Sequence, residues 1–520
     1  MTPIRLIRSF ATVGGWTLAS RVLGFVRDAW IAAALGTGPS AQAFIVAFSL
    51  PNMFRRFFAE GAFNTAFVPM FSKKFEAGDG AEDFAREALS GLATIVLILT
   101  LLAQVFMPWL VLAMASGFRG DERFDLAVVY GRIAFPYILF ISLAALASGV
   151  LNATGRFVAS AAAPVLLNVI FIVALSAAMM TQTDPLQGWD PGLTITWAVP
   201  LAGAAQLALV WWAARRAGFS LVPRIPRWTP EMKRLAIVAA PAMLAGGVVQ
   251  INLLVGRQVS SYYGDAVAWL YNADRLYQLP LGVVAIAIGV VLLPDLSRRL
   301  KADDLDGSRA SFNRAAEFAL ALTLPAAVAL VVVATPLVSV LFERGRFGPE
   351  DTAATALAVA VYGVGLPAFV LQKVLQPLFF AREDTRRPFY YAVVSMVVNA
   401  VLAVGLATYI GYIAAAVATS MAAWAMVWQL WVGSRGMGEA VRVDARLKAR
   451  APRIALASLI MGAAIWAANW ALGPLLSAVG WRYIGLLLLV LAGMVSYFGA
   501  GMMIGAFRLS DFKSAMRRGG

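Results

Sequence analysis

The residues of this sequence best suited to chemistry are arginines that lie within long apolar segments. Arg21 and Arg27 fall in the first such segment, Arg55 in the second and Arg275 in the eighth. An ionisable group in an apolar segment is costly to bury, so it usually serves a function. Guanidinium groups donate paired hydrogen bonds to phosphate or carboxylate, which an ammonium group cannot do. These four residues therefore predict an anion-binding site.

Acidic residues accompany these arginines. Asp28 follows Arg27, and Glu60 stands one helical turn after Arg56, where a helix would let the two pair. On a regular helix Arg21 and Asp28 share a face, whereas Arg27 projects about 100° away from Asp28. The alternative to an anion site is a structural network of ion pairs, or arginines that extend to the membrane surface.

A second acidic neighbour, Asp274, precedes Arg275. Across the whole set the arginines outnumber the acids, and a surplus of buried cations favours an anionic ligand. Lys373, Arg56 and Asp274 are further candidates for this site. The remaining ionisable residues inside apolar segments lie near segment ends and are expected to anchor at the membrane interface: Arg132, Arg257 and Glu317.

Several classes of function are excluded by what the sequence lacks. It has no Cys and no His, which removes thiol nucleophiles, Cys or His metal sites and Ser-His-Asp triads. It contains no GxxxxGK[ST] phosphate loop. The net charge of +15 is expected to lie in loops between membrane spans, so no nucleic-acid partner is predicted. We predict no catalytic site and no cofactor, although a coupling cation such as sodium is compatible with the sequence.

The elements that must position these residues are membrane spans. Of the 520 residues, 61% are hydrophobic, and the mean hydropathy is +0.76. Apolar runs of about 20 residues, the length that crosses a bilayer, recur along the whole chain. We predict an all-α membrane protein with about fourteen transmembrane helices, at residues 9–35, 41–71, 87–116, 126–153, 159–181, 194–214, 235–261, 266–296, 312–342, 352–380, 388–409, 411–433, 453–472 and 482–506.

The distribution of basic residues predicts the orientation of these spans. Lys and Arg residues outside the spans gather in alternate loops, such as 215–234 and 435–453. The other set of loops holds only Arg119, Arg123, Arg344, Arg346 and Arg482. Because positive loops stay in the cytoplasm, both termini are expected to be cytoplasmic.

An internal repeat relates the two halves of the chain. VPMFSKK at 68–74 matches LPDLSRR at 293–299. Tyr130-Gly131 before Pro136 matches Tyr362-Gly363 before Pro367, and Asn168 matches Asn399, at a nearly constant offset along the chain. Spans 1–6 and 7–12 are thus predicted to be two parallel six-helix lobes around a central cavity, followed by two extra C-terminal helices. The predicted boundaries are 1–230, 231–450 and 451–520. Two like-oriented lobes around a central cavity are the plan of an alternating-access transporter, so we predict a transporter and not an enzyme.

Three stretches carry a resemblance to a known family. SRVLGFVRDA at 20–29, LPNMFRRFFAEGAF at 50–63 and ADRL at 273–276 resemble the MurJ (MviN) family of the multidrug/oligosaccharidyl-lipid/polysaccharide exporter superfamily. The resemblance covers essentially the whole chain and its fourteen spans. It implies a flippase that moves lipid II, the undecaprenyl-diphosphate-linked disaccharide peptide of peptidoglycan synthesis, from the cytoplasmic to the periplasmic leaflet of the bacterial inner membrane.

The resemblance also implies roles for particular residues. Arg21, Arg27, Arg55 and Arg275 match essential arginines of a cationic central cavity used in alternating access. Asp28 and Glu60 match acids at the cavity and its gates, and spans 13 and 14 match a groove for the lipid tail. The implied partners are lipid II, membrane lipids and cell-wall synthesis proteins.

Two positions depart from the family pattern, and three alternatives stay open. Gln42 stands where an acid is common and Ala268 where a Ser is common, which puts a secondary contact at each in doubt. The alternatives are a flippase for another polyprenyl-diphosphate oligosaccharide, a cation-coupled drug exporter and a scaffold for cell-wall enzymes. A drug exporter for cations would need a negative cavity, which the arginine surplus opposes. The energy source is left open by the sequence.

Overall fold

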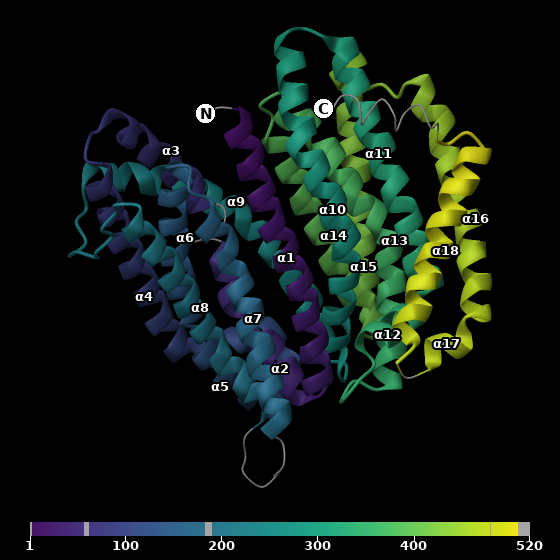
Figure 1. Cartoon of the computed structure of the whole chain (residues 1–520), viewed down its shortest axis with the longest axis horizontal. Helices are drawn as coiled ribbons and strands as arrows, with labels where there is room; N and C mark the ends of the chain where they lie inside the picture. The colour runs from purple at the N-terminus through teal and green to yellow at the C-terminus, as the bar shows by residue number, and fades with distance from the viewer. Residues whose placement is uncertain (1–2, 57–61, 182–189, 479, 508–520) are drawn as a thin grey trace. The chain divides into compact units, whose positions relative to one another are not determined.

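Helices form every regular element of the part of the chain described by this computed structural model, residues 3–56, 62–181, 190–478 and 480–507 (Figure 1). The first half contains α1 Pro3–Leu35, α2 Pro39–Arg55, α3 Ala62–Ala77, α4 Ala81–Ala115, the 3₁₀ turn η2 Ser116–Phe118, α5 Glu122–Ala134, α6 Tyr137–Ala153, α7 Val158–Thr181, α8 Pro191–Arg216 and α9 Pro230–Ser260. The second half contains α10 Ala266–Lys301, α11 Leu305–Val332, α12 Ala334–Phe342, α13 Pro349–Phe380, α14 Arg386–Ile410, α15 Ile413–Ser434, η4 Arg435–Met437, η5 Glu439–Val441, α16 Ala445–Ala471, α17 Gly473–Ser477 and α18 Arg482–Met503.

The all-α membrane fold predicted from the sequence is confirmed. Within the described residues, 10 helical stretches are long and apolar enough to cross a membrane, and they coincide with predicted spans 3–6 and 9–14. The other four predicted spans fall on α1, on α2 with α3, on α9 and on α10. Three of these four carry the arginines singled out above. The helices are compatible with fourteen spans, but this count stays a prediction.

Helix α4 shows how such a span is built. Ala85, Leu89, Val96 and Met107 are among the buried residues of one face, at helical spacing. The opposite face exposes large apolar side chains, among them Ile98, Leu101, Leu102, Val105, Phe106 and Trp109. A continuous exposed apolar face on a helix of 35 residues suits contact with lipid and not with water. The protein is therefore an integral membrane protein.

Predicted span 4 consists of two helices, and proline explains the break. Helix α5 ends at Ala134 and α6 begins at Tyr137, with Pro136 between them. Proline has no N–H, so the carbonyl of Arg132 loses its helical hydrogen bond. Gln104 Nε2 on α4 donates to that carbonyl at 2.9 Å, and Arg132 Nε donates to the Gln104 carbonyl at 3.2 Å. The freed carbonyl is thereby satisfied, and Arg132 is held at the surface of α4.

The chain forms two compact units. Unit 1 comprises Met1–Ala268 with Arg344–Phe347, and unit 2 comprises Trp269–Glu343 with Gly348–Gly520. Helix α9 lies in unit 1 because it packs on α3 and α4. Lys74 Nζ on α3 lies 2.7 Å from Glu231 Oε1 at the start of α9, and this hydrogen bond raises the pKa of Lys74. The two lobes predicted from the sequence remain predictions, because these units are defined by which helices pack together and not by the internal repeat.

The internal repeat recurs in the backbone at helix ends. Gly78 follows α3 at φ +67° and Asp303 follows α10 at φ +55°, at corresponding positions of the repeat. In each case the next amide bonds back to an earlier turn of the helix, from Asp79 to the Lys74 carbonyl at 3.0 Å and from Asp304 to the Arg299 carbonyl at 2.9 Å. These are the left-handed helix ends of a Schellman motif, formed at equivalent places.

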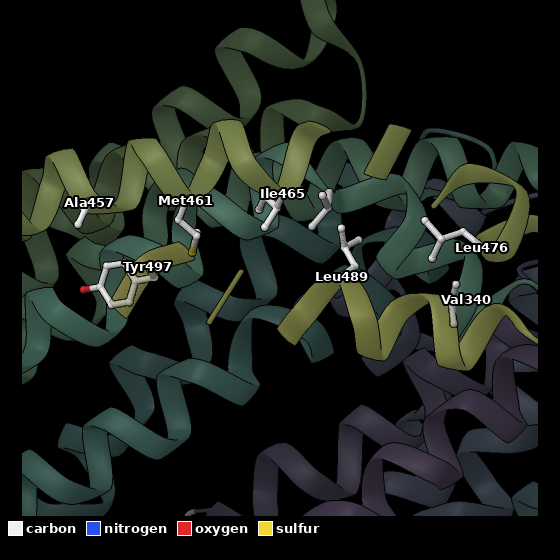
Figure 2. Close-up of a cluster of buried hydrophobic side chains, with 8 residues drawn as sticks. Val340, Ala457, Met461, Ile465, Leu476, Leu489 and Tyr497 are labelled. Atoms are coloured by element: carbon white, nitrogen blue, oxygen red, sulfur yellow. The ribbon is translucent and has the colours of Figure 1, made fainter. Parts of the chain in front are cut away.

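The extra C-terminal helices pack on α11 and α12 through an apolar core. In Figure 2, Ala457, Met461 and Ile465 of α16 point toward residues of α17, α18 and α12. The core also contains Val333, Val340, Leu476, Leu489 and Tyr497, each less than 9% exposed. At one end of this core, the Tyr497 hydroxyl donates to the Ala321 carbonyl on α11 at 2.6 Å. This packing joins α16–α18 to α11 and α12 within unit 2.

Candidate functional site

The structure joins Arg27 and Asp28 into an ion pair on α1. Arg27 Nε and Nη2 donate to Asp28 Oδ1 at 2.9 and 2.7 Å. The two side chains are 12% and 4% exposed. The expectation that Arg27 projects away from Asp28 is wrong for the charged group, because the long side chain lets the guanidinium reach around the helix. A buried carboxylate therefore offsets the charge of Arg27.

A third residue, Asn168 of α7, fixes the guanidinium from the other side. Arg27 Nη1 donates to Asn168 Oδ1 at 2.9 Å, and Asn168 Nδ2 donates to the Ser20 carbonyl on α1 at 2.9 Å. The ring of Phe171, one turn further along α7, lies 5.8 Å from the Arg27 carbon Cζ. Asn168 is only 4% exposed, so this amide is a rigid support for Arg27. The site prediction missed Asn168, although the match to Asn399 had marked the position.

Arg21 differs from Arg27 in its surroundings. It lies on α1 and is exposed, and it makes no hydrogen bond or ion pair with the residues the structure describes. Asp28, which shares its helix face on a regular helix, is engaged by Arg27 instead. Arg21 is thus available to a ligand, whereas Arg27 is held in one orientation.

The candidate residues of the second predicted span lie where α2 ends. Arg55 is the last residue of this helix and is partly buried, and Arg56 follows it and is exposed. Glu60 lies outside the described residues. Its predicted pairing with Arg56 and its predicted role as a gate therefore remain predictions.

The remaining candidate residues belong to unit 2. The Arg275 guanidinium lies over the ring of Tyr271, 4.4 Å from its centroid, which is a cation–π contact. Gln278 Nε2 donates to Asp274 Oδ2 one turn along α10. Lys373 lies on α13 and is exposed. Convergence of Arg275 with Arg21, Arg27 and Arg55 on one cavity remains a prediction.

Glu317 has a larger role than the expected interface anchor. Its carboxylate accepts hydrogen bonds from Arg450 Nη1 at 2.6 Å and from Arg446 Nε and Nη2 at 3.1 Å each, and Arg314 also pairs with it. Arg446 and Arg450 lie on α16, so this cluster joins the C-terminal helices to α11. The side chains of Glu317 and Arg450 are 13% and 9% exposed.

The two positions that depart from the family pattern are both buried. Gln42 is 1% exposed, and its Nε2 donates to Asp265 Oδ1 at 2.7 Å. Its Oε1 accepts from Arg123 Nη1 at 3.2 Å. Ala268 is fully buried near the start of α10. At Gln42 a neutral amide thus meets a carboxylate from the α9–α10 loop.

Comparison with known proteins identifies the family. The family model described as lipid II flippase MurJ matches residues 31–492. A probable lipid II flippase MurJ of Rhizobium meliloti is 46% identical over 522 residues, which cover 99% of this chain and 97% of the relative. The lipid II flippase MurJ of Burkholderia cenocepacia is 37% identical over 404 residues, covering 76% of this chain and 77% of the relative.

Solved structures show the same fold. A lipid II flippase MurJ in an inward closed conformation superposes with a TM-score of 0.78 at 24% identity, covering 94% of this chain and 98% of that one. A multidrug resistance MATE transporter in an inward-facing conformation gives a TM-score of 0.67 at 16% identity, covering 82% and 96%. Both likenesses concern the fold alone. The family model and the full-length relatives settle the assignment, and this chain belongs to the MurJ family of lipid II flippases, which are transporters.

Proposed function

We propose that this protein flips lipid II from the cytoplasmic to the periplasmic leaflet of the inner membrane by alternating access. The observation that carries the proposal is the 46% identity with a probable lipid II flippase over 99% of the chain. The anionic diphosphate is the part of such a substrate that is hardest to move through hydrocarbon, since isolated charges there are strongly disfavoured.

The proposed binding group is the set of arginines Arg21, Arg27, Arg55 and Arg275. Arg27 is preset for this role, because its bonds to Asp28 and Asn168 fix the plane of the guanidinium before a ligand arrives. Those three hydrogen bonds leave guanidinium N–H groups for phosphate oxygens, since an arginine side chain has five. Arg21, exposed on the same helix, supplies a charge that no acid among the described residues offsets.

Other candidate residues fill supporting roles in this proposal. Asp28 acts as a cavity acid that keeps Arg27 oriented, and Glu60 acts as a gate acid. Arg56, Asp274 and Lys373 are further contacts for the substrate or for the arginines. The groove for the lipid tail is proposed to run along α16 and α18, whose outer faces expose Leu459, Trp466, Leu487 and Val495 among other apolar side chains.

The proposed setting follows from the charges of the loops. Both termini and the loops 215–234 and 435–453 are placed in the cytoplasm. Membrane lipids surround the protein, and cell-wall synthesis proteins are its proposed partners. No resident cofactor is proposed, since the chain lacks Cys, His and a phosphate loop. A cation gradient or the membrane potential is the proposed source of energy.

The test uses bacteria depleted of their own lipid II flippase and expressing this chain. The measured quantity is lipid II that reaches the outer leaflet, detected by an enzyme or antibiotic that acts only there. We expect restored outer-leaflet lipid II and growth. Abundant, folded protein in the membrane without any outer-leaflet lipid II would contradict the proposal, and transport of a different polyprenyl-diphosphate oligosaccharide would redirect it.

A further inference from the structure

The segment that connects α8 to α9 has one buried side and one exposed side. Residues 219–229 of this segment form neither helix nor strand, and they are here called the strap. Phe219 and Leu221 are only 9% and 1% exposed, and the ring of Phe219 packs edge-on against Phe71 of α3, with centroids 6.0 Å apart. One side of the strap therefore belongs to the core of unit 1.

Side chains near the start of α4 hold the strap in place. Arg86 Nε donates to the Ser220 carbonyl at 2.6 Å, and the Ser220 amide donates to Glu82 Oε1 at 3.0 Å. One helical turn after Arg86, Ser90 Oγ accepts a hydrogen bond from the Arg224 amide at 2.8 Å. These bonds clamp the backbone of the strap along α4.

The second repeat contains a similar clamp. Arg309 and Asn313 of α11 stand at the corresponding places, with an offset close to that of the repeated motifs. Arg309 Nε donates to the Arg442 carbonyl at 3.2 Å, and Asn313 Oδ1 accepts from the Asp444 amide at 3.0 Å. The structure describes all of the clamped segment 435–444, and none of its large apolar side chains is exposed. An exposed apolar surface is thus no requirement of the clamp itself.

The strap of the first repeat does expose apolar side chains. Its sequence VPRIPRW at 222–228 repeats an apolar residue, a proline and an arginine, and then ends on tryptophan. Proline fixes its own φ at about −65° and keeps the preceding residue extended. An extended chain of this kind has about three residues per turn, so every third side chain shares a side. Val222, Ile225 and Trp228 have this spacing and are 47%, 87% and 74% exposed.

Cations surround this apolar row. Five exposed basic residues form no ion pair with an acid among the residues described by the structure: Arg215, Arg216, Arg227, Lys233 and Arg234. Acids of the adjoining helices α4 and α9, Glu82, Asp83 and Glu231, are instead paired with other basic side chains. The exposed surface thus combines apolar side chains with a net positive charge.

We infer that the strap is a membrane-surface anchor. Val222, Ile225 and Trp228 enter the headgroup region of one leaflet, and the surrounding cations bind the phosphates of anionic lipids. Tryptophan is enriched at this depth of a bilayer, and Lys and Arg beside it are attracted to anionic lipids. The proposed orientation of 215–234 makes this the cytoplasmic leaflet.

The helices on both sides of the strap favour lipid over a cytosolic protein as its partner. Trp212 near the end of α8 is 52% exposed, and Ile237 and Val238 near the start of α9 are 62% and 51% exposed. The apolar row of the strap therefore lies in sequence between two helix ends that also expose apolar side chains. A segment between two membrane-spanning helices begins and ends at the bilayer surface.

The first test measures the depth of a single spin label, which the Cys-free chain allows. Full-length protein with a nitroxide on Ile225→Cys is reconstituted into vesicles of phosphatidylcholine, with or without one quarter phosphatidylglycerol. The measured quantity is the ratio of the label's accessibility to oxygen, which concentrates in the bilayer, to its accessibility to an uncharged, water-soluble nickel complex. Glu439→Cys is the matched control, because Glu439 is 46% exposed and lies in the clamped segment of the second repeat. In the anionic vesicles we expect a ratio at least fivefold higher for Ile225→Cys, and equal ratios would overturn the inference.

The second test concerns the charge. Arg227→Gln, added to labelled Ile225→Cys, should lower the oxygen-to-nickel ratio severalfold in vesicles with phosphatidylglycerol and change it little in phosphatidylcholine alone. Arg119→Gln is the control, because Arg119 is exposed, lies outside the strap and pairs with no acid among the described residues. A ratio that responds neither to phosphatidylglycerol nor to Arg227→Gln would overturn the binding of anionic lipid.

Neither measurement involves transport, which separates this inference from the proposed function. A label on Ile225→Cys that is shielded from nickel in native membranes but open to it in both kinds of vesicle would overturn the lipid anchor in favour of a protein partner. An anchored strap in a chain that moves no lipid II would contradict only the proposed function. A strap open to water in a chain that flips lipid II would contradict only this inference.

Discussion

The Oδ1 atom of Asp28 lies 2.7 Å from Nη2 of Arg27, the residue directly before it on α1. Both side chains are largely buried, and Asn168 holds the guanidinium from α7. An arginine that carries its own counter-charge can be inserted into a membrane span and still present N–H groups to a ligand. The pair therefore links the stability of α1 to its proposed function.

Asp28→Asn should destabilise the protein. It keeps the size of the side chain but leaves Arg27 without its buried counter-charge, and breaking such a pair costs about 3–5 kcal/mol. Thermal unfolding in detergent should show a clear drop in Tm, and the double variant Arg27→Met/Asp28→Asn should recover part of it. Asp83→Asn is the control, because Asp83 is 65% exposed and its pairs lie at the surface. Equal Tm values for Asp28→Asn and Asp83→Asn would show that the buried pair of Arg27 and Asp28 adds no stability.

Asn168→Ala should weaken substrate binding more than it weakens the fold. The substitution removes one hydrogen bond to a charged group and one to a backbone carbonyl, worth about 1–3 kcal/mol. We expect the lipid II concentration for half-maximal flipping to rise, because Arg27 is no longer fixed in orientation. Asn52→Ala is the control, since Asn52 Nδ2 bonds only to its own helix, to the Phe48 carbonyl at 2.8 Å. An unchanged half-maximal concentration would make Asn168 a purely structural residue.

Glu317→Gln should loosen the C-terminal helices. The carboxylate receives three arginines, two of them from α16, so its loss leaves cations facing one another. Thermal stability in detergent should fall, and protease should cut the η5–α16 junction faster. Glu439→Gln serves as the comparison, because Glu439 is 46% exposed and pairs with exposed Arg442. If Glu439→Gln were equally damaging, the Glu317 cluster would have no special role in attaching α16.

Single cysteines test the proposed orientation, since the parent chain has none. Arg224→Cys lies in the segment between predicted spans 6 and 7, which is assigned to the cytoplasm. Ser477→Cys lies at the end of α17, in the segment between predicted spans 13 and 14, which is assigned to the periplasm. Both positions are exposed, so accessibility depends on the side of the membrane. An impermeant thiol reagent added to intact cells should label Ser477→Cys and spare Arg224→Cys until the cells are broken. Labelling of Arg224→Cys from outside would reverse the topology.

The features that could be predicted from the sequence are those that depend on a single property, either apolar length or charge within an apolar segment. Apolar length indicated the spans, and charge inside them indicated Arg27 and Asp28 as site residues. The pairing of these two residues was missed, because helix geometry places the Cβ atoms but not the end of a long flexible side chain. The break at Pro136 was missed because the apolar pattern continues across it, while the backbone loses one hydrogen bond.

Uncharged polar residues were the main gap in the predicted site. Asn168 carries no charge, so an apolar segment can hold it without a functional reason, and only its contact with Arg27 gives it a role. Gln42 stood out as a departure from the family pattern, but its carboxylate partner Asp265 lies in the other half of the chain. Contacts between the two repeats, such as that of Gly345 with Ala33, depend on folding of the whole chain.

We propose that the diphosphate of lipid II binds to Arg21, Arg27, Arg55 and Arg275. The most direct measurement is outer-leaflet lipid II in flippase-depleted cells that express single alanine variants of these arginines, with Arg132→Ala as the matched control. Arg132 is exposed and bonds to the Gln104 carbonyl, so its loss should leave flipping intact. We expect each of the four alanine variants to lower flipping at least tenfold. Flipping by Arg27→Lys, which keeps the charge but loses the paired donors, should fall between that of the parent and that of Arg27→Ala. Parental flipping by all four alanine variants, folded and equally abundant, would show that these arginines do not bind the substrate.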